Sequence, residues 1–346
     1  ERSSMRKFTA ELEREDVAVV ERLEEVSATI RRQAAQMGKR EVRYLVDTYY
    51  QIQDRRKASS NQERSIREAD EPSSLSGFLA GLDTFAEDKI RLMLQAYAEG
   101  NKDASWAMSI IGIGPVISAG LAAHIDITKA PTVGHIWRFA GIDPSQQWKG
   151  SKVAGELVAS HLGGRKPTSE DVYALAEKMQ GLRAESVLRL ATTKKDGSPT
   201  KLTATTLKNA LAVRPFDAGL KVLCWKIGES FVKVKNRKDD IYGKLYDVRK
   251  RLEEERNEAG LFKSQAEQKL EKYKIGKETD AYKFYSKGML PPAHIHSRAK
   301  RYAVKIFLAH YHHVAYEVAF GEAPPKPYII EIKGHAHYMR PPNWPM

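Results

Sequence analysis

The chain of 346 residues contains a single cysteine, Cys224, in the apolar stretch KVLCWKI. One cysteine excludes a framework of disulfide bonds and a zinc site built from thiolates. A lone cysteine among apolar residues is typical of a small side chain in a protein core. We therefore predict that Cys224 is buried and takes no part in catalysis.

Long apolar runs are also missing. No stretch approaches the roughly 20 consecutive apolar residues that a membrane-spanning helix needs, and no signal-peptide pattern opens the chain. Together with the scarcity of cysteine, this favours a reducing compartment. We expect a soluble, cytoplasmic protein associated with the nucleoid.

Acidic residues are outnumbered by basic ones, with 44 Asp and Glu against 57 Lys and Arg, a net charge of +13 and a pI of about 9.5. Residues 191–310 contain 27 Lys and Arg and 14 Asp and Glu, which accounts for the whole excess. Such an excess predicts a polyanionic partner, most commonly nucleic acid and next an anionic membrane surface. We expect nucleic acid, in the first place DNA and alternatively RNA, and no membrane.

The first 71 residues contain no proline, and their apolar residues recur at steps of three and four between charged ones. This pattern predicts a helical hairpin or coiled coil over residues 1–72. Such helices favour a homo-oligomer, most simply a dimer. The polar stretch KASSNQERSIREADEPSS, at 57–74, predicts a linker at the end of this region.

Neither an alternation of strands and helices nor an internal repeat is found in the rest of the chain, which predicts a mainly α fold. Thr168 or Ser169 and Thr203 are expected to begin helices as N-caps. The tail contains one candidate strand. We predict connecting helices at 73–104, a helix-hairpin-helix core at 105–165, a helical insertion at 166–215, a basic helical region at 216–320 and a proline-rich tail at 321–346.

The stretch SIIGIGPVISAGLAAHIDI, at 109–127, interrupts an apolar run with two glycines and a proline. Gly112 and Gly114 fit a tight turn between two helices, and Pro115 fits the first turn of the second helix. Ala119 is small enough for the two helices to approach closely. The turn and the helix N-terminus would form an anion site. We predict a helix-hairpin-helix, which grips a sugar–phosphate backbone without reading its sequence; the alternative is a core helix broken by glycines.

The segment IIGIGPVISAGLAAHIDITKAPTVGHIWRFAGIDPSQQWKG, at 110–150, resembles the C-terminal domain of the IS-one-ten type of insertion-sequence transposases. Residues 205–320 resemble that domain more loosely, around an insertion. The resemblance implies DNA strand transfer. It also implies an N-terminal RuvC-like domain with four acidic metal ligands, a C-terminal serine that attacks DNA, a dimerising coiled coil and a structured RNA that guides targeting.

The chain differs from this family in the residues that catalyse DNA strand transfer. No RuvC-like strand with an Asp is found in its helical N-terminal part, and Lys149 stands where the family has its serine. Ser145 and Ser151 lie close by and are alternative nucleophiles. We predict a DNA-binding frame without nuclease chemistry and without a cofactor. The alternative is an active serine recombinase or transposase that uses Mg²⁺, and the second alternative is a coiled-coil structural or regulatory adaptor.

The predicted mechanism is capture of the phosphate backbone. The amides of Gly112, Ile113 and Gly114 hold one phosphate, and Lys149 and Lys152 hold the next. Binding by such contacts depends strongly on salt and tolerates any base sequence. Further basic residues are predicted to extend the track, namely Lys233, Lys235, Arg237, Lys238, Arg298, Lys300 and Arg301.

Seven of the ten histidines lie after residue 293. His310 and His313 have helical spacing, with Glu317 one turn further on, and are candidate metal ligands. The interpretation that we favour is histidines on helix surfaces and interfaces, without a metal.

Overall fold

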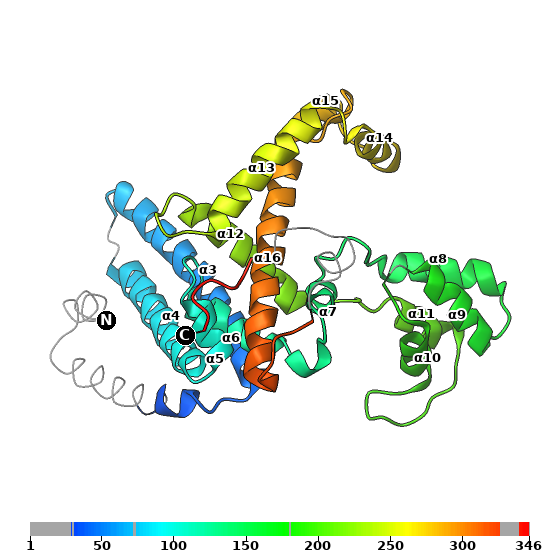
Figure 1. Ribbon diagram of the computed structural model, residues 1–346, viewed down its shortest axis with the longest axis horizontal. Coiled ribbons are helices and arrows are strands. Elements are labelled where there is room, and N and C mark those ends of the chain that lie inside the picture. Colours follow the sequence, from blue (N-terminus) through cyan, green and yellow to red (C-terminus); the bar gives the residue numbers. More distant parts are fainter. Residues whose placement is uncertain (1–28, 30, 72–73, 180, 326–338, 346) are drawn as a thin grey trace. The chain divides into compact units, whose positions relative to one another are not determined.

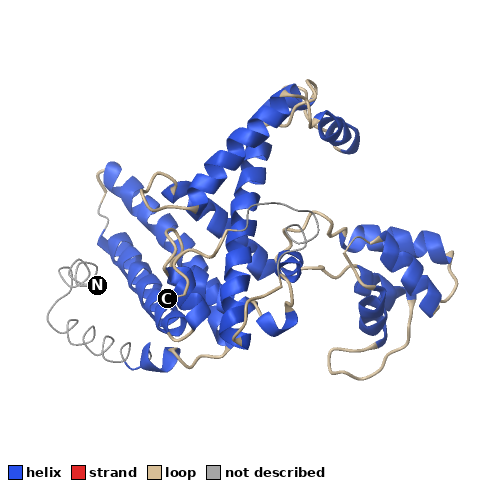
Figure 2. Ribbon diagram, viewed as in Figure 1, coloured by secondary structure: helices blue, strands red, loops and turns tan. Residues whose placement is uncertain are grey.

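The computed structural model describes residues 29, 31–71, 74–179, 181–325 and 339–345. Within these ranges the chain forms the fourteen helices α3 to α16, one 3-10 turn and helical residues at 29 and 31–34, and no strand (Figure 2), so the predicted mainly α class is confirmed. Among the helices so described, none combines the length and the apolar character needed to cross a membrane. The chain divides into two compact units, one of Glu1–Lys129 with Trp225–Met346 and one of Ala130–Cys224.

The first unit begins with a helical hairpin of α3, Lys39–Glu68, and α4, Ser74–Glu99, which lie side by side (Figure 1). Asp83 of α4 pairs with Arg55 and accepts a hydrogen bond from Ser59 Oγ at 3.1 Å. The linker predicted at 57–74 is therefore wrong as far as Glu68, because α3 continues to that residue and its Ser59 bonds to α4. Residues 1–28 of the predicted hairpin lie outside the described residues.

The centre of this unit is α6, Pro115–His124, which follows the short helix α5, Lys102–Met108. Every residue of α6 from Val116 onward is buried, so the helix is apolar on all sides. At its C-terminus the Arg43 guanidinium donates to the carbonyl of Ala123 at 2.8 and 3.0 Å. A cation at that end offsets the negative end of the helix dipole.

A cluster of aromatic side chains joins α5 to three further helices, which are α12, Ala218–Val234, α13, Tyr242–Glu258, and α16, Pro292–Phe320. Trp106 stacks on Phe307 with ring centroids 5.9 Å apart, and Tyr242 stacks on Phe231 at 4.8 Å. All four side chains are fully buried. Burial of each contributes about 1.5–3 kcal/mol, so this cluster fixes the position of the end of α12.

Two short helices, α14, Lys263–Lys272, and α15, Asp280–Tyr285, lie at the end of the α13–α16 pair (Figure 1). The buried Asn257 side chain fastens them. Its Nδ2 donates to the carbonyl of Leu290 at 2.9 Å, and its Oδ1 accepts from the amide of Leu290 at 2.8 Å. The α14–α15 tip is thereby attached firmly to the two long helices.

The described part of the tail, 339–345, lies against α5 and α16. Trp106 Nε1 donates to the carbonyl of Pro342 at 2.7 Å, and Asn343 Nδ2 donates to the carbonyl of Ser109 at 3.2 Å. The candidate strand of the tail falls on residues outside the described ones.

The second unit contains five helices besides the start of α12. They are α7, Val133–Phe139, α8, Gly150–Leu162, α9, Ser169–Lys178, α10, Ala184–Thr192, and α11, Ala204–Leu211. Thr168 and Thr203 are the N-caps of α9 and α11, each with a reciprocal capping box, as predicted. The apolar faces of α8 to α11 enclose one core, which includes Val158, Leu175, Val187 and Leu207.

Candidate nucleic-acid interface

The turn between α5 and α6 has the compact form that the two glycines predict. Gly112 adopts a left-handed φ of +93°, which few residues other than glycine tolerate. The amide of the buried Ile113 donates to the carbonyl of Ile110 at 2.9 Å. That amide is bonded inside the turn and does not face solvent. Gly114 is therefore the outward-facing residue of the turn between α5 and α6, which we call the hairpin from here on.

Gly114 is the N-cap of α6 and is exposed, although the rest of the helix is buried. Its carbonyl accepts from the amide of Ser118 at 3.0 Å, which starts the helix. Pro115 occupies the first helical position, as predicted, where its missing N–H costs nothing. The first amides of an α-helix have no partner within the helix, and the dipole places partial positive charge beside them. The one end of α6 that reaches the surface is thus suited to an anion.

The C-terminal end of α12 lies against this turn. Ser230 Oγ donates a hydrogen bond to the carbonyl of Gly112, 118 residues earlier in the chain. A Cβ at Gly112 would lie 3.1 Å from Cγ2 of Val234. Because Val234 stands between Lys233 and Lys235, this contact brings the basic run 233–238 beside the hairpin.

We call residues 233–244 the basic corner, since they connect α12 to α13. Lys235 Nζ pairs with Asp247 Oδ1 at 2.9 Å. The other cations of the corner are exposed, and they are Lys233, Arg237, Lys238 and Lys244. Asp240 is buried, and its carboxylate accepts from the amide of Lys244 at 2.9 Å. Asp239 is the one exposed acid of the corner beside four exposed cations, so positive charge dominates its outer face.

Gly243 allows the corner to close tightly. A Cβ at this position would lie 2.6 Å from the carbonyl oxygen of Phe231 and 2.6 Å from Cα of Lys235. Only glycine fits such an approach of backbone to backbone. The start of α13 is therefore pressed onto the end of α12, which fixes where the basic corner lies.

Two of the predicted track residues on α16 have structural partners. Arg298 Nε donates to Glu253 Oε2 at 2.7 Å, and its guanidinium lies 4.5 Å from the ring centroid of Phe262. Lys300 Nζ pairs with Glu229 and is largely buried. Arg301 is exposed. Arg298 and Lys300 therefore stabilise the fold, and the exposed part of the predicted track is the basic corner with Arg301.

Lys149 and Lys152 belong to the second unit, at the start of α8. Lys149 is the N-cap residue, and its Nζ donates to the carbonyl of Lys178 at 2.5 Å. Lys152 is exposed in the first turn. They are the only predicted cations of this unit.

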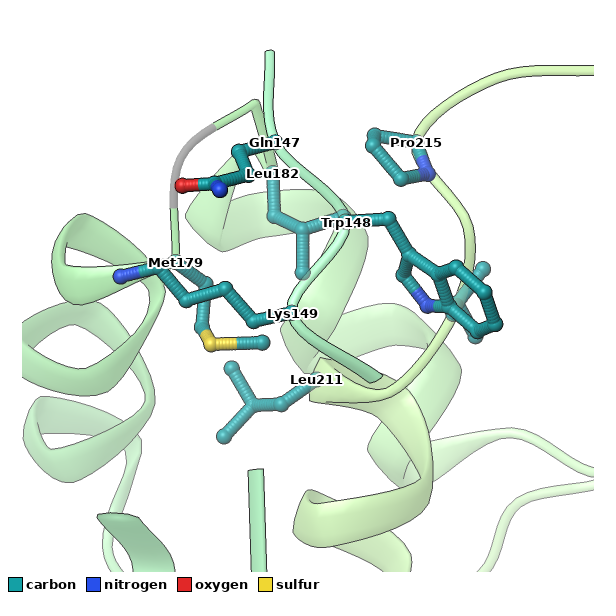
Figure 3. Close-up of a pocket in the computed structure, with 8 residues that line it drawn as sticks. Gln147, Trp148, Lys149, Met179, Leu182, Leu211 and Pro215 are labelled. Atoms are coloured by element: carbon teal, nitrogen blue, oxygen red, sulfur yellow. The ribbon is translucent and has the colours of Figure 1, made fainter. Parts of the chain in front are cut away.

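A shallow depression lies beside Lys149 (Figure 3), lined by Gln147, Trp148, Lys149, Met179, Leu182, Leu211, Val213 and Pro215. It is open to solvent and encloses no cavity comparable with the roughly 300 Å³ of the smallest usual ligand pockets. Trp148 is 44% exposed, and the Arg214 guanidinium lies 4.7 Å from its ring centroid. The depression is too small for a drug-sized ligand.

The alternative nucleophiles Ser145 and Ser151 are both exposed. Ser145 Oγ donates to Asp143 Oδ1 at 2.8 Å within a tight turn, and Ser151 lies in the first turn of α8. Over the residues that the structure describes, no three His, Cys, Asp or Glu side chains gather as a metal site.

The two candidate metal ligands, His310 and His313, both have partners within the protein. His310 is buried, with Nδ1 2.7 Å from the Tyr242 hydroxyl and Nε2 3.0 Å from the carbonyl of Met339, so both ring nitrogens have partners. Burial lowers the pKa of His310 to about 4. His313 Nε2 lies 2.9 Å from Glu317 Oε1.

Cys224 is buried, as predicted, and burial raises the pKa of its thiol to about 12. Because the thiolate is the reactive form, this cysteine is not a nucleophile near neutral pH.

Sequence reasoning missed two groups of exposed cations. One is Lys244 of the basic corner. The chain leaves α12 and turns over residues 235–241 before α13 begins, so that Lys244 Nζ donates to the carbonyl of Lys238. The other is the set of lysines between residues 263 and 287. The second group could have been found from the amino-acid composition of residues 263–287, because this segment is rich in lysine and contains no arginine.

The comparisons with known proteins agree with the resemblance seen in the hairpin segment. Residues 104–164 match the family described as Transposase IS116/IS110/IS902 family. The matched segment contains the hairpin turn, Lys149 and Lys152. Comparisons with curated proteins and with solved structures give no match.

Proposed function

We propose that the protein binds the sugar–phosphate backbone of DNA through the hairpin at Gly114 and the basic corner, without cutting it. The observation that carries this proposal is the contact of Ser230 with Gly112. It brings an exposed helix N-terminus and four exposed cations, far apart in sequence, to one surface of the first unit. A phosphate at Gly114 would meet the positive end of α6, with the ammonium and guanidinium groups of the corner beside it.

The choice of DNA rests on the family match, because a transposase acts on DNA. The hairpin offers backbone amides and point charges instead of side chains shaped to read base edges. We therefore propose binding that tolerates any sequence. Lys149 and Lys152 of the second unit supply a further backbone contact.

The proposal of binding without cleavage rests on the sequence resemblance and on two observations. The resemblance places Lys149 where the family has its serine. The Ser145 hydroxyl is bonded within its own turn, and the described residues contain no cluster of metal ligands. An active recombinase is the competing function. Incubation of labelled DNA with the protein and Mg²⁺ separates the two, because strand cleavage or a covalent adduct between protein and DNA would contradict our proposal.

We further propose that the protein acts as a dimer, formed through the N-terminal helices. The first two turns of α4 present an exposed apolar stripe at helical spacing, made of Leu75, Phe78, Leu79 and Leu82, of which Leu75 is 80% exposed. No charged residue occurs from 74 to 82, although 29% of the whole chain is charged. A second copy would bury this stripe by pairing like helices, and the dimer could bridge two duplexes.

The experiment that tests the proposed site is fluorescence anisotropy with a labelled duplex over a series of salt concentrations. Each phosphate contact adds about 0.9 to the slope of log affinity against log salt. We expect a Lys233→Ala, Lys238→Ala double variant to lower that slope by about 2. Lys250→Ala is the matched control, because Lys250 pairs with Glu254 on α13. Equal slopes in the wild type and the double variant would contradict the proposed site.

A further inference from the structure

The α14–α15 tip carries a second concentration of positive charge. Residues 263–287 contain seven lysines, no arginine and four acidic residues. Lys283 pairs with Asp280 at 3.2 Å, and no other lysine of this fully described segment forms an ion pair. We call the segment 263–287 the lysine tip. The other six ammonium groups form no ion pair and are available to an anionic partner.

An exposed aromatic ring stands among these charges. Tyr273 follows the last residue of α14 and is 47% exposed. Lys269 Nζ and Lys272 Nζ lie 4.8 and 5.7 Å from the centroid of its ring. An accessible aromatic face beside cations is the arrangement that binds single-stranded nucleic acid, in which a base stacks on the ring and the cations neutralise phosphates.

The lysine tip is a rigid platform. Phe262 and Ile295 are buried with Leu290, and the Asn257 side chain bonds both backbone groups of Leu290. Arg298 covers the ring of Phe262. Because the tip is attached through buried contacts, its lysines and Tyr273 need little further ordering when a ligand binds.

A buried cluster of ion pairs supports the tip. Glu253 is fully buried and forms ion pairs with three arginines, Arg249, Arg256 and Arg298. The cluster lies at the base of the tip, since Arg298 contacts both Phe262 and Gln265.

We propose that the lysine tip binds single-stranded nucleic acid, with Tyr273 stacked on an unpaired base and Lys269 and Lys272 on the adjoining phosphates. This site goes beyond the proposed function, because it shares no residue with the hairpin or the basic corner and requires an unpaired base. DNA and RNA offer the same base faces and phosphates, so one experiment with two probes distinguishes them.

The test uses the full-length protein and two labelled probes, a 20-nucleotide oligo-dT and a 20-nucleotide oligo-U, with a 20-base-pair duplex as reference. We expect Tyr273→Ala to weaken binding of a single strand at least fivefold and to leave duplex binding unchanged. Tyr273→Phe keeps the aromatic face and should bind as the wild type does. Whichever of the two probes loses affinity identifies the ligand as DNA, RNA or both.

Charge reversal supplies the second arm. Lys269→Glu with Lys272→Glu should weaken single-strand binding more than tenfold, whereas Lys283→Glu, with its charge already paired to Asp280, should have a smaller effect. An oligonucleotide carrying 5-bromodeoxyuridine or 5-bromouridine should crosslink to Tyr273 on irradiation. Unchanged affinity of Tyr273→Ala for both single strands, or an equal loss for single strand and duplex, would overturn the proposal.

Discussion

Ser230 Oγ donates a hydrogen bond to the carbonyl oxygen of Gly112, which ties the end of α12 to the hairpin turn. The bond joins the two sequence features that most suggest contact with a phosphate backbone, the glycine turn and the basic run 233–238. Each feature alone has an ordinary explanation, as a broken core helix or as a solvated helix end. Their contact gives them a shared surface.

We predict that Gly112→Ala destabilises the protein. The φ of +93° disfavours any residue with a Cβ, and the new methyl group would lie 3.1 Å from Val234 and 3.2 Å from Ser230. Steric crowding and backbone strain together should cost about 1–3 kcal/mol. Urea unfolding would measure this loss, with Gly114→Ala as the control. Gly114 has a φ of −99° and no heavy atom within 4 Å of an added Cβ, so its free energy of unfolding should change by less than about 0.5 kcal/mol.

The same open space at Gly114 makes a direct test of binding practicable. Gly114→Glu places a carboxylate at the N-terminus of α6, where a phosphate is proposed to bind. We expect it to abolish tight binding of duplex DNA, because the anion site is then filled and its charge neutralised. Anisotropy would follow the affinity, and thermal unfolding should show an intact fold. A Gly114→Glu protein that binds duplex as the wild type does would rule out the hairpin as the phosphate site.

We predict that, among the acidic residues of α13 and α16, Glu253 contributes most to the stability of the fold. Glu253→Gln removes the charge that compensates three arginines in a buried place, and it should cost about 3 kcal/mol. Its neighbour Glu254 is a matched control, since it forms an exposed pair with Lys250 at 3.4 Å, and Glu254→Gln should cost less than about 1 kcal/mol. Urea unfolding of both variants would show the difference, and similar losses would contradict the assignment.

The contribution of Glu253 should also depend on pH. Burial alone would raise the pKa of this carboxyl, but the hydrogen bond from Arg298 and the charges of Arg249 and Arg298 lower its pKa below the ordinary value of 4.5. A carboxyl whose pKa is lower in the folded state stabilises the fold fully above its unfolded-state pKa. That stabilisation is lost as the pH falls through the folded value. The difference in stability between wild type and Glu253→Gln should therefore be constant near neutral pH and shrink below pH 4.5.

Local features were predictable from the sequence because they depend on a few neighbouring residues. Thr168 and Thr203 cap their helices and Pro115 starts α6, all from short-range rules. The environment of the basic residues was harder to predict, because the local sequence around a helical lysine does not show whether its side chain faces solvent or pairs with a distant acid. Lys300 meets Glu229, 71 residues away, and no local pattern reveals that pair.

The histidines show how far helical spacing can guide an assignment. His313 lies 2.9 Å from Glu317, one helical turn further on. His310 instead takes its partners from residues 242 and 339, which only the tertiary fold brings close. The proposed hairpin site shares this dependence, because its turn was evident from two glycines but its cations come from a helix more than a hundred residues later.

The apolar stripe on α4 allows the proposed dimer to be tested apart from DNA binding. Leu79 is 58% exposed at the middle of the stripe, so Leu79→Glu should leave the monomer fold intact while placing two like charges in a symmetric interface. Sedimentation should show a dimer for the wild type and a monomer for the variant. Leu261→Glu is the control, because Leu261 is also well exposed, at 67%, but lies outside the stripe. Loss of the dimer should abolish bridging of two duplexes and leave the affinity for one duplex largely intact, since the stripe contains no basic residue. A variant that sediments as the wild type does would show that this stripe does not join two copies.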